Sequence, residues 1–271
     1  MIIISVLIKD YGKIIEDVKG GKRMSLRISQ LTGGYTRKPV INDVSFEVES
    51  GEIVGLIGLN GAGKSTTIKH IMGLMEPFSG EITVDGLTLK ENPIEYRKKI
   101  AFVPETPMVY RSLTLKEHLE ITAMAYDIPF ETLMERAYPL LKLFRLDERM
   151  DWFPADFSKG MKQKVMIACA FVIDPNLIVI DEPFVGLDPI AIMDLEKLLL
   201  DEKEKGSSIL MSTHVLANAE KICDSFVILH NGHVFAKGTK EELSKEFHLE
   251  DADLETIYRF VAQEEGFRHD A

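Results

Sequence analysis

The stretch from Gly58 to Thr66 constrains the fold of this chain more than any other feature of the sequence. It reads Gly-Leu-Asn-Gly-Ala-Gly-Lys-Ser-Thr and fits the phosphate-binding pattern G-x-x-x-x-G-K-[ST]. An apolar, β-branched run over 53–57 predicts a buried strand before it, and the unbroken segment 66–72 predicts a helix after it. A glycine-rich turn that matches by chance is the alternative, which the order strand, loop, helix disfavours. The predicted nucleotide-binding residues of the loop are Gly58, Leu59, Asn60, Gly61, Ala62, Gly63, Lys64, Ser65 and Thr66.

Phosphate binding requires these residue types in this order. Glycines let the backbone turn its N–H groups toward a phosphate, and the N-terminus of the following helix adds partial positive charge. Lys64 would reach the β- and γ-phosphates of a nucleotide, and the Ser65 hydroxyl would bind Mg²⁺. The sequence therefore predicts a nucleotide and Mg²⁺ as ligands.

The composition disfavours two classes of protein. The chain has 271 residues, enough for one large domain or two small ones. Its formal net charge of -11 disfavours a broad nucleic-acid-binding face, so no nucleic-acid partner is expected. No segment of the sequence approaches the ~20 consecutive apolar residues that a membrane-spanning helix needs.

Residues 1–23 show no motif that fits the rest of the chain. A strand-like alternation begins only at Met24. We interpret 1–23 as an N-terminal extension and hypothesise that it is a translated leader, with Met24 as the natural start. Gly20-Gly21 is encoded by GGN-GGN, where a bacterial ribosome-binding site for Met24 would lie. A genuine short extension is the alternative.

A second buried strand ends in two acids. The apolar run 177–180 is typical of a parallel strand, and Asp181 and Glu182 follow it. Ligands of parallel α/β sheets bind at this edge. Asp181 would help to hold Mg²⁺, while Glu182 would orient the attacking water or accept its proton. A solvated turn is the alternative, which the phosphate loop upstream disfavours.

Three further residues stand where they could reach a nucleotide. Tyr35 precedes a strand-like segment and could lie against a flat base, although a surface-loop aromatic explains its position equally well. Glu105 heads the loop after a short predicted strand. His214 stands at the end of another predicted strand, at the same sheet edge as Asp181, and could hydrogen-bond a phosphate oxygen.

The middle of the chain reads as helical. Apolar spacing predicts helices over 115–126 and 131–146, without a strand signal between them. We therefore expect an inserted helical subdomain over about residues 106–168. Upstream of it, segments 81–84 and 87–89 flank a turn and predict a hairpin.

A possible anion site opens the next helix, which we expect over 162–172. Ser158 and Gly160 stand at its start, and Lys159 adds positive charge. A plain serine cap is the equal alternative.

The C-terminal segment, 249–271, reads as a helical tail. Apolar spacing predicts an amphipathic helix from about 253 to 262. This face either packs on the body of the protein or docks a partner. The residues that share it are Leu254, Ile257, Tyr258 and Val261.

Together these features resemble those of the ABC-type ATPases, over about residues 26–247. The distinctive part is the stretch 157–163, Phe-Ser-Lys-Gly-Met-Lys-Gln, which stands in the place of the family's Leu-Ser-Gly-Gly-Gln signature before Asp181-Glu182. The resemblance implies an α/β fold with a P-loop NTPase core of ABC-ATPase type, an antiparallel β subdomain and an inserted α-helical subdomain. It places the ATPase domain at 24–248, followed by the tail 249–271.

The resemblance also implies a Mg-dependent ATPase that powers an exporter-like ABC transporter. Tyr35 would stack on adenine, His214 would contact the γ-phosphate, and Asp188 would help to join two subunits. Two ATP molecules would be sandwiched between two copies of the chain. A transmembrane subunit would be the other partner, which places the chain in the cytoplasm on the inner face of the cell membrane. The signature residues that would act in trans on the other copy's nucleotide are Ser158, Lys159 and Gly160.

Three residues depart from the family pattern. Glu105 stands where the family usually has glutamine, a residue that contacts the nucleotide and its metal. A carboxylate there would either bind Mg²⁺ more strongly or repel the γ-phosphate, and the sequence does not choose between these. Lys159 replaces a glycine and Met161 replaces a glutamine.

Two other functions remain open at this point. The first is a non-transport ABC ATPase that acts as a mechanical clamp on a soluble partner, which a single phosphate loop and the lack of sustained heptads disfavour. The second is a regulatory nucleotide-binding module with negligible turnover, against which Glu182 argues.

Overall fold

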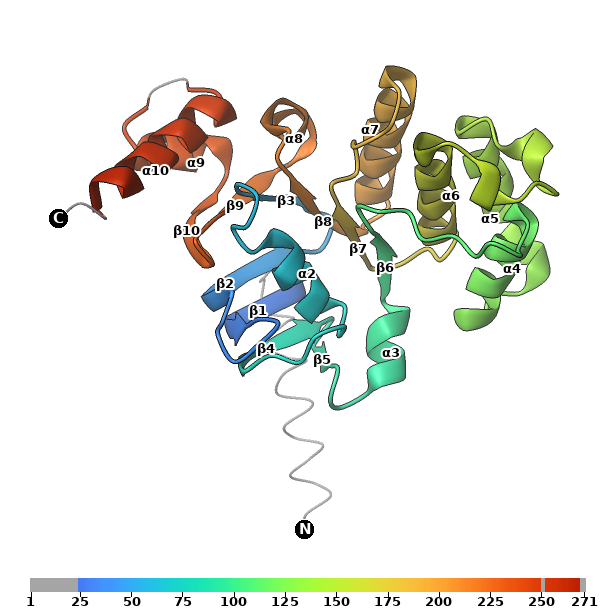
Figure 1. Cartoon of the computed structure of the whole chain (residues 1–271), viewed down its shortest axis with the longest axis horizontal. Coiled ribbons are helices and arrows are strands. Elements are labelled where there is room, and N and C mark those ends of the chain that lie inside the picture. Colours follow the sequence, from blue (N-terminus) through green and yellow to red (C-terminus); the bar gives the residue numbers. More distant parts are fainter. Residues whose placement is uncertain (1–23, 250–251, 269–271) are drawn as a thin grey trace, which may run out of the picture.

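The computed structural model describes residues 24–249 and 252–268, and the proposed leader, 1–23, lies outside them (Figure 1). The strands form two sheets. A four-stranded antiparallel sheet has the order β2-β1-β4-β5, and a six-stranded sheet has the order β10-β9-β3-β8-β7-β6. In the larger sheet every neighbouring pair is parallel except β9 with β10.

The strand bounds follow the predicted segments closely. The antiparallel sheet comprises β1 (Met24–Gly33), β2 (Ile41–Glu49), β4 (Ser79–Val84) and β5 (Leu87–Thr88). The larger sheet comprises β3 (Ile53–Ile57), β6 (Ile100–Val103), β7 (Leu177–Asp181), β8 (Ser208–Thr213), β9 (Ser225–His230) and β10 (His233–Gly238).

The larger sheet is covered on both faces, which explains its continuous apolar strands. Every residue of β3, β7 and β8 is buried. Because side chains alternate along a strand, Val54 and Leu56 join a core with the antiparallel sheet and with helices α2 (Lys64–Ile71) and α3 (Pro93–Lys98). Ile53 and Ile57 face the opposite way, into a core shared with the helices of residues 115–261. The sheet therefore separates two hydrophobic cores.

The helices gather in groups around this sheet. Figure 1 shows α4, α5 and α6 together at one end of the molecule, and α9 and α10 at the other. The helices are α2 (Lys64–Ile71), α3 (Pro93–Lys98), α4 (Leu115–Ala125), α5 (Phe130–Leu143), α6 (Lys159–Phe171), α7 (Pro189–Glu204), α8 (Leu216–Ile222), α9 (Lys240–Glu246) and α10 (Leu254–Arg268).

Several helices differ from the prediction at their ends, among them α5, which was expected over 131–146 and ends at Leu143. Helix α6 begins three residues earlier than expected, because the Ser158 side chain accepts a hydrogen bond from Met161 N and caps it. Helix α10 continues past 262 to Arg268, and its predicted apolar face packs against the core of this chain. Helices α3, α8 and α9 are short and were not predicted.

Candidate functional site

The predicted site residues converge on a pocket of about 390 Å³. It lies at the carboxyl ends of the parallel strands, where α/β sheets bind ligands. Val40 is the one lining residue that the sequence did not single out. The predicted residues that line the pocket are Tyr35, Leu59, Asn60, Gly61, Gly63, Lys64, Ser65, Thr66, Glu105, Glu182 and His214.

The glycines of the phosphate loop have the conformations that the pattern requires. Gly61 and Gly63 have positive φ angles, 86° and 110°, which side chains rarely allow. A Cβ atom on Gly63 would also overlap the Ile41 side chain. Helix α2 begins directly after Gly63, so its N-terminus faces the pocket.

The Lys64 ammonium group lies inside the loop. Its Nζ donates to the Gly58 carbonyl at 2.7 Å and to the Leu59 carbonyl at 3.4 Å. Glu182 Oε1 lies 3.8 Å from the same nitrogen, and both side chains are more than nine-tenths buried. A buried cation held by two carbonyls and one carboxylate is ready to exchange these partners for phosphate oxygens.

Glu182 also contacts His214 across neighbouring strands. Its second oxygen, Oε2, lies 2.8 Å from His214 Nδ1 and 3.3 Å from the His214 amide. The Glu182 backbone has a φ of 51°, in the left-handed region, and its N–H donates to the Ser212 carbonyl at 3.1 Å. The end of β8 thus fixes where the carboxylate points.

Asp181 stands behind the pocket. It is buried, and it accepts a hydrogen bond from the Ser212 hydroxyl. Magnesium prefers a few hard oxygen ligands together with phosphate oxygens and water. The Ser65 hydroxyl and the Asp181 and Glu105 carboxylates are such ligands, so these residues fit the ion that the sequence predicts.

Tyr35 stands at the pocket rim with its ring exposed. Lys69, which the sequence analysis missed, donates to the Tyr35 hydroxyl at 2.9 Å and lies 4.9 Å from the ring centroid. This hydrogen bond, with a second from Thr66, lowers the pKa of Tyr35. Lys69 is one helical turn beyond Ser65, a spacing that could have indicated its direction.

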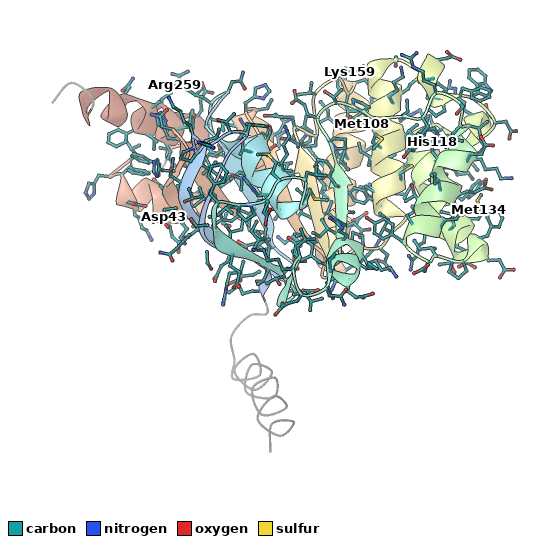
Figure 2. The ribbon with its side chains drawn as sticks, turned by 60° about the horizontal axis from the view of Figure 1, so that its bottom comes forward. Asp43, Met108, His118, Met134, Lys159 and Arg259 are labelled. Carbon is teal, nitrogen blue, oxygen red and sulfur yellow. The ribbon has the colours of Figure 1, made fainter. Side chains whose placement is uncertain are left out.

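The signature residues lie apart from this pocket in the same chain. Ser158 and Lys159 are exposed at the N-terminus of α6, where Figure 2 labels Lys159. A Cβ atom on Gly160 would overlap the Gly186 carbonyl, so only glycine permits this close approach.

Asp188 caps α7 and is tied to the signature helix. Its carboxylate accepts from Ala191 N and from Lys164 Nζ, both at 2.9 Å. The Lys164 hydrogen bond is the main reason that the pKa of Asp188 is lowered to about 2. Asp188 is therefore charged at neutral pH and held by its own chain.

A second contact joins α6 to the loop that carries Glu105. The Gln163 side chain is fully buried, and its Nε2 donates to the Pro104 carbonyl at 3.3 Å. Its Oε1 makes no hydrogen bond. Helix α6 therefore contacts two loops: Gln163 bonds the loop after β6, and Lys164 bonds the loop after β7.

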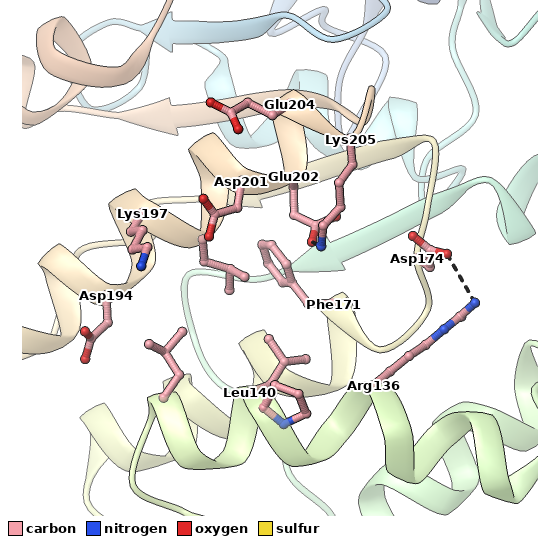
Figure 3. A pocket seen from close by; sticks show the side chains of 13 residues that line it. Arg136, Leu140, Phe171, Asp174, Asp194, Lys197, Asp201, Glu202, Glu204 and Lys205 are labelled. Atoms are coloured by element: carbon pink, nitrogen blue, oxygen red, sulfur yellow. Dashed lines mark hydrogen bonds and ion pairs between the residues drawn. The ribbon is translucent and has the colours of Figure 1, made fainter.

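A larger cavity does not coincide with these residues. It has a volume of about 940 Å³ and lies between α5, α6 and α7 (Figure 3). Its rim carries both signs of charge, including the Arg136–Asp174 ion pair at 3.1 Å. None of the predicted site residues lines it, so the chemistry of the lining, and not the volume, identifies the candidate site.

Comparisons with known proteins agree with this geometry. The family model described as "ABC transporter" matches residues 41–185, from β2 through the loop after Glu182. The chain is 57% identical to the ABC-type transporter ATP-binding protein EcsA of Bacillus subtilis over 241 residues, which cover 89% of this chain and 98% of that protein. It is 30% identical to the lipopolysaccharide export system ATP-binding protein LptB of Escherichia coli, over 87% and 99% of the two chains.

A solved structure extends the likeness to three dimensions. The structure of an ATP-binding subunit of an ABC transporter superposes with a TM-score of 0.86 at 54% identity, and covers 88% of this chain and 99% of that one. The predicted fold class and family resemblance are thereby confirmed.

Proposed function

This chain belongs to the ABC transporter family as an ATP-binding subunit, and from that premise we propose that it hydrolyses Mg-ATP to drive an exporter-like transporter. The observation that carries the proposal is the placement of Glu182 between Lys64 and His214 in the phosphate-loop pocket. A carboxylate beside the expected γ-phosphate position is what hydrolysis requires, and mere nucleotide binding does not.

Each group has a separate task in the proposed reaction. The loop amides, the N-terminus of α2 and Lys64 hold the phosphates and offset their charge. Glu182 orients the attacking water or accepts its proton. His214 holds the Glu182 carboxylate in place through Nδ1, and His214 also contacts the γ-phosphate. Magnesium, held by Ser65, Asp181 and Glu105, would offset charge on the β- and γ-phosphate oxygens. Tyr35 would stack on adenine.

The exposed signature supports a homodimer in the ATP-bound state. Ser158, Lys159 and Gly160 do not line their own pocket. A second copy, turned head-to-tail, would bring them to the first copy's nucleotide, with Asp188 at the junction. Such an arrangement has two equivalent sites, as a two-fold symmetric dimer requires.

A transmembrane subunit is the proposed second partner. None of the helices in the described part of the chain has the length and the apolar content of a membrane span. Large apolar side chains are exposed in the loop after Glu105, namely Met108 and Tyr110. These exposed apolar groups beside the site support a contact with that subunit there, and we propose that the chain lies at the inner face of the cell membrane. The export function of LptB is the support for the exporter-like direction.

Affinity purification from gently solubilised membranes, combined with an ATPase assay on the same sample, tests this proposal. We expect a polytopic membrane protein to copurify and to raise turnover. A soluble or ribosomal partner without any membrane protein would instead support the mechanical clamp. Binding of ATP without turnover in every sample would favour a regulatory nucleotide-binding module.

A further inference from the structure

The loop that carries Tyr35 begins at a glycine that lies against helix α2. The loop spans 34–39, between β1 and β2, and is exposed from Tyr35 onward. Its two ends meet where the Val40 N–H donates to the Gly33 carbonyl at 2.8 Å. The other side of Gly33 faces the ring of His70, a buried residue of α2. The place of Tyr35 therefore depends on how closely Gly33 approaches this ring.

Only a glycine permits the approach. A Cβ atom on Gly33 would lie 2.3 Å from His70 Nε2 and 2.5 Å from His70 Cε1, far inside van der Waals contact. The φ of Gly33 is not positive, so the steric contact alone, and not the backbone conformation, requires a glycine here. The next residue is crowded as well, because a Cβ atom on Gly34 would lie 2.8 Å from both Lys38 O and Val40 N.

The His70 ring is held so that it cannot easily give way. Its Nδ1 lies 3.0 Å from the Met75 carbonyl, which only accepts hydrogen bonds, so Nδ1 carries the proton and donates it. Its Nε2 is buried and has no hydrogen-bond partner. The ring therefore acts on Gly33 through its shape and not through a polar contact. An added methyl group at Gly33 would push the exposed loop outward, because the enclosed ring has no room to turn.

The same helix also forms the phosphate site. Helix α2 begins at Lys64, and His70 follows six residues later, about 9 Å along the helix axis at 1.5 Å per residue. Lys69 makes a second contact with the loop, a hydrogen bond to the Tyr35 hydroxyl, but this bond is exposed to solvent. Exposed polar contacts contribute little, so the buried contact of His70 with Gly33 is the one that fixes the loop.

We propose that His70 is a positioning residue for nucleotide binding, whose ring against Gly33 sets the distance between the Tyr35 ring and the phosphate loop. One rigid helix then holds the phosphates at its start and fixes the base-stacking ring from its last turn. This inference rests on the proposed function, because it requires that Tyr35 stack on the base of a bound nucleotide.

The test uses the full chain and the substitution Gly33→Ala, made both in the natural chain and together with Tyr35→Ala. Titration calorimetry would measure the affinity of each protein for Mg-ADP, and thermal unfolding would confirm that each is folded. A further protein combines Gly33→Ala with His70→Ala, which makes room for the added methyl group.

Gly55→Ala is the matched control. Gly55 lies in β3, its φ is not positive, and a Cβ atom there would lie 3.0 Å from the Phe226 ring. The control therefore adds the same methyl group at another crowded, buried glycine, which does not touch the Tyr35 loop.

We expect Gly33→Ala to bind Mg-ADP about threefold to 30-fold more weakly, because it disturbs a stacking contact. When Tyr35 is already replaced by alanine, the same change should alter the affinity by no more than about twofold, since the contact is gone. The combination of Gly33→Ala with His70→Ala should bind more tightly than Gly33→Ala alone. Gly55→Ala should lower the melting temperature, and any effect on affinity should be the same with or without the Tyr35 ring.

Three results would overturn the inference. Unchanged affinity in Gly33→Ala would show that the ring yields and the loop stays in place. An equal loss with and without Tyr35 would show a purely structural role. No recovery on adding His70→Ala would show that another group limits the approach, and the comparison with Tyr35→Ala decides the matter if that protein does not fold.

Failures of the proposed function are recognised separately. If the natural chain does not bind Mg-ADP, the proposed function fails. If the natural chain binds and Tyr35→Ala binds equally well, the stacking role of Tyr35 fails, and the positioning role of His70 fails with it. A loss in Tyr35→Ala combined with any of the three results above contradicts only the role of His70.

Discussion

Glu182 Oε2 lies 2.8 Å from His214 Nδ1, although the two residues are 32 positions apart in the chain. The contact exists because β7 and β8 are parallel neighbours and Asp181 pairs with Ser212 in register. A ring nitrogen that faces a carboxylate carries the proton and donates it. His214 therefore needs a second proton, on Nε2, if it is also to donate to a phosphate oxygen.

The first prediction concerns the Glu182 carboxylate. Glu182→Gln should keep ATP binding but slow hydrolysis by about 10²–10⁴-fold, the usual contribution of a general base. Because ATP then persists, the closed dimer should accumulate in gel filtration. Glu204→Gln, on the exposed end of α7, is the control and should hydrolyse normally. Unchanged turnover in Glu182→Gln would remove this residue from catalysis.

Lys64 should be needed for binding. Lys64→Ala removes a charge-assisted contact of about 1.5–3 kcal/mol, so nucleotide affinity should fall about tenfold to 150-fold. Equilibrium binding of Mg-ADP measures this. Normal affinity would contradict the assignment of the phosphate loop.

Tyr35 should contribute through its ring and not through its hydroxyl. Tyr35→Ala should weaken ATP binding by about 1–3 kcal/mol, as aromatic–base stacking contacts do. Tyr35→Phe keeps the ring but loses the bond to Lys69, and it should bind nearly as well. If both variants bind equally weakly, the hydroxyl and not the stacking surface is important.

The signature should act across the dimer. Ser158→Asp keeps an oxygen that can cap α6 but places negative charge before the partner's phosphates, so it should abolish hydrolysis. Ser158→Asn is the uncharged control. Mixed one to one with Lys64→Ala, the Ser158→Asp chain should recover turnover up to about a quarter of the normal rate, because half the dimers then hold one intact site. No recovery on mixing would argue for action within one chain.

Folding stability should depend on His70 below neutral pH. Its side chain is buried, Nδ1 lies 3.0 Å from Met75 O, and Nε2 has no partner beside Gly33. Burial lowers the pKa of His70 below 6.5, so the unfolded chain binds the extra proton first. Its contribution is therefore complete above pH 6.5 and is lost as the pH falls below that value.

Urea unfolding between pH 7.5 and pH 5.5 measures this dependence. The slope due to one proton is at most about 1.4 kcal/mol per pH unit. His70→Gln cannot titrate and should show a flatter profile over the same range. Parallel profiles for the two proteins would exclude His70 as the cause.

The sequence predicted those strands and helices whose apolar residues form a clear pattern within one segment. The apolar runs at 53–57 and 177–180 correctly predicted β3 and β7, because a strand that is buried on both faces consists of consecutive apolar residues. Helix α6 began earlier than expected because one side chain, Ser158, sets its start. Helix α8 has only seven residues, too few for a clear apolar period.

The candidate site was predictable in its members but not in its connections. Lys64 was identified from the phosphate-binding pattern, and Glu182 and His214 from their positions at the ends of predicted strands. The Ser212 hydroxyl bond to Asp181 depends on the register of two strands, and the Lys69 bond to Tyr35 depends on how β1 approaches α2. Neither pairing has a local sequence pattern.

In the proposed dimer, the buried Gln163 side chain would couple the two nucleotide sites mechanically. Through Pro104 it fastens α6 to the loop that would contact the chain's own nucleotide, while the start of α6 would serve the neighbour's. A shift of the loop that carries Glu105 would therefore move α6, and α6 would move the signature residues at the neighbouring copy's nucleotide. Hydrolysis of ATP at one site would therefore weaken the contacts of the signature with the nucleotide at the other site. Such coupling favours alternating hydrolysis at the two sites.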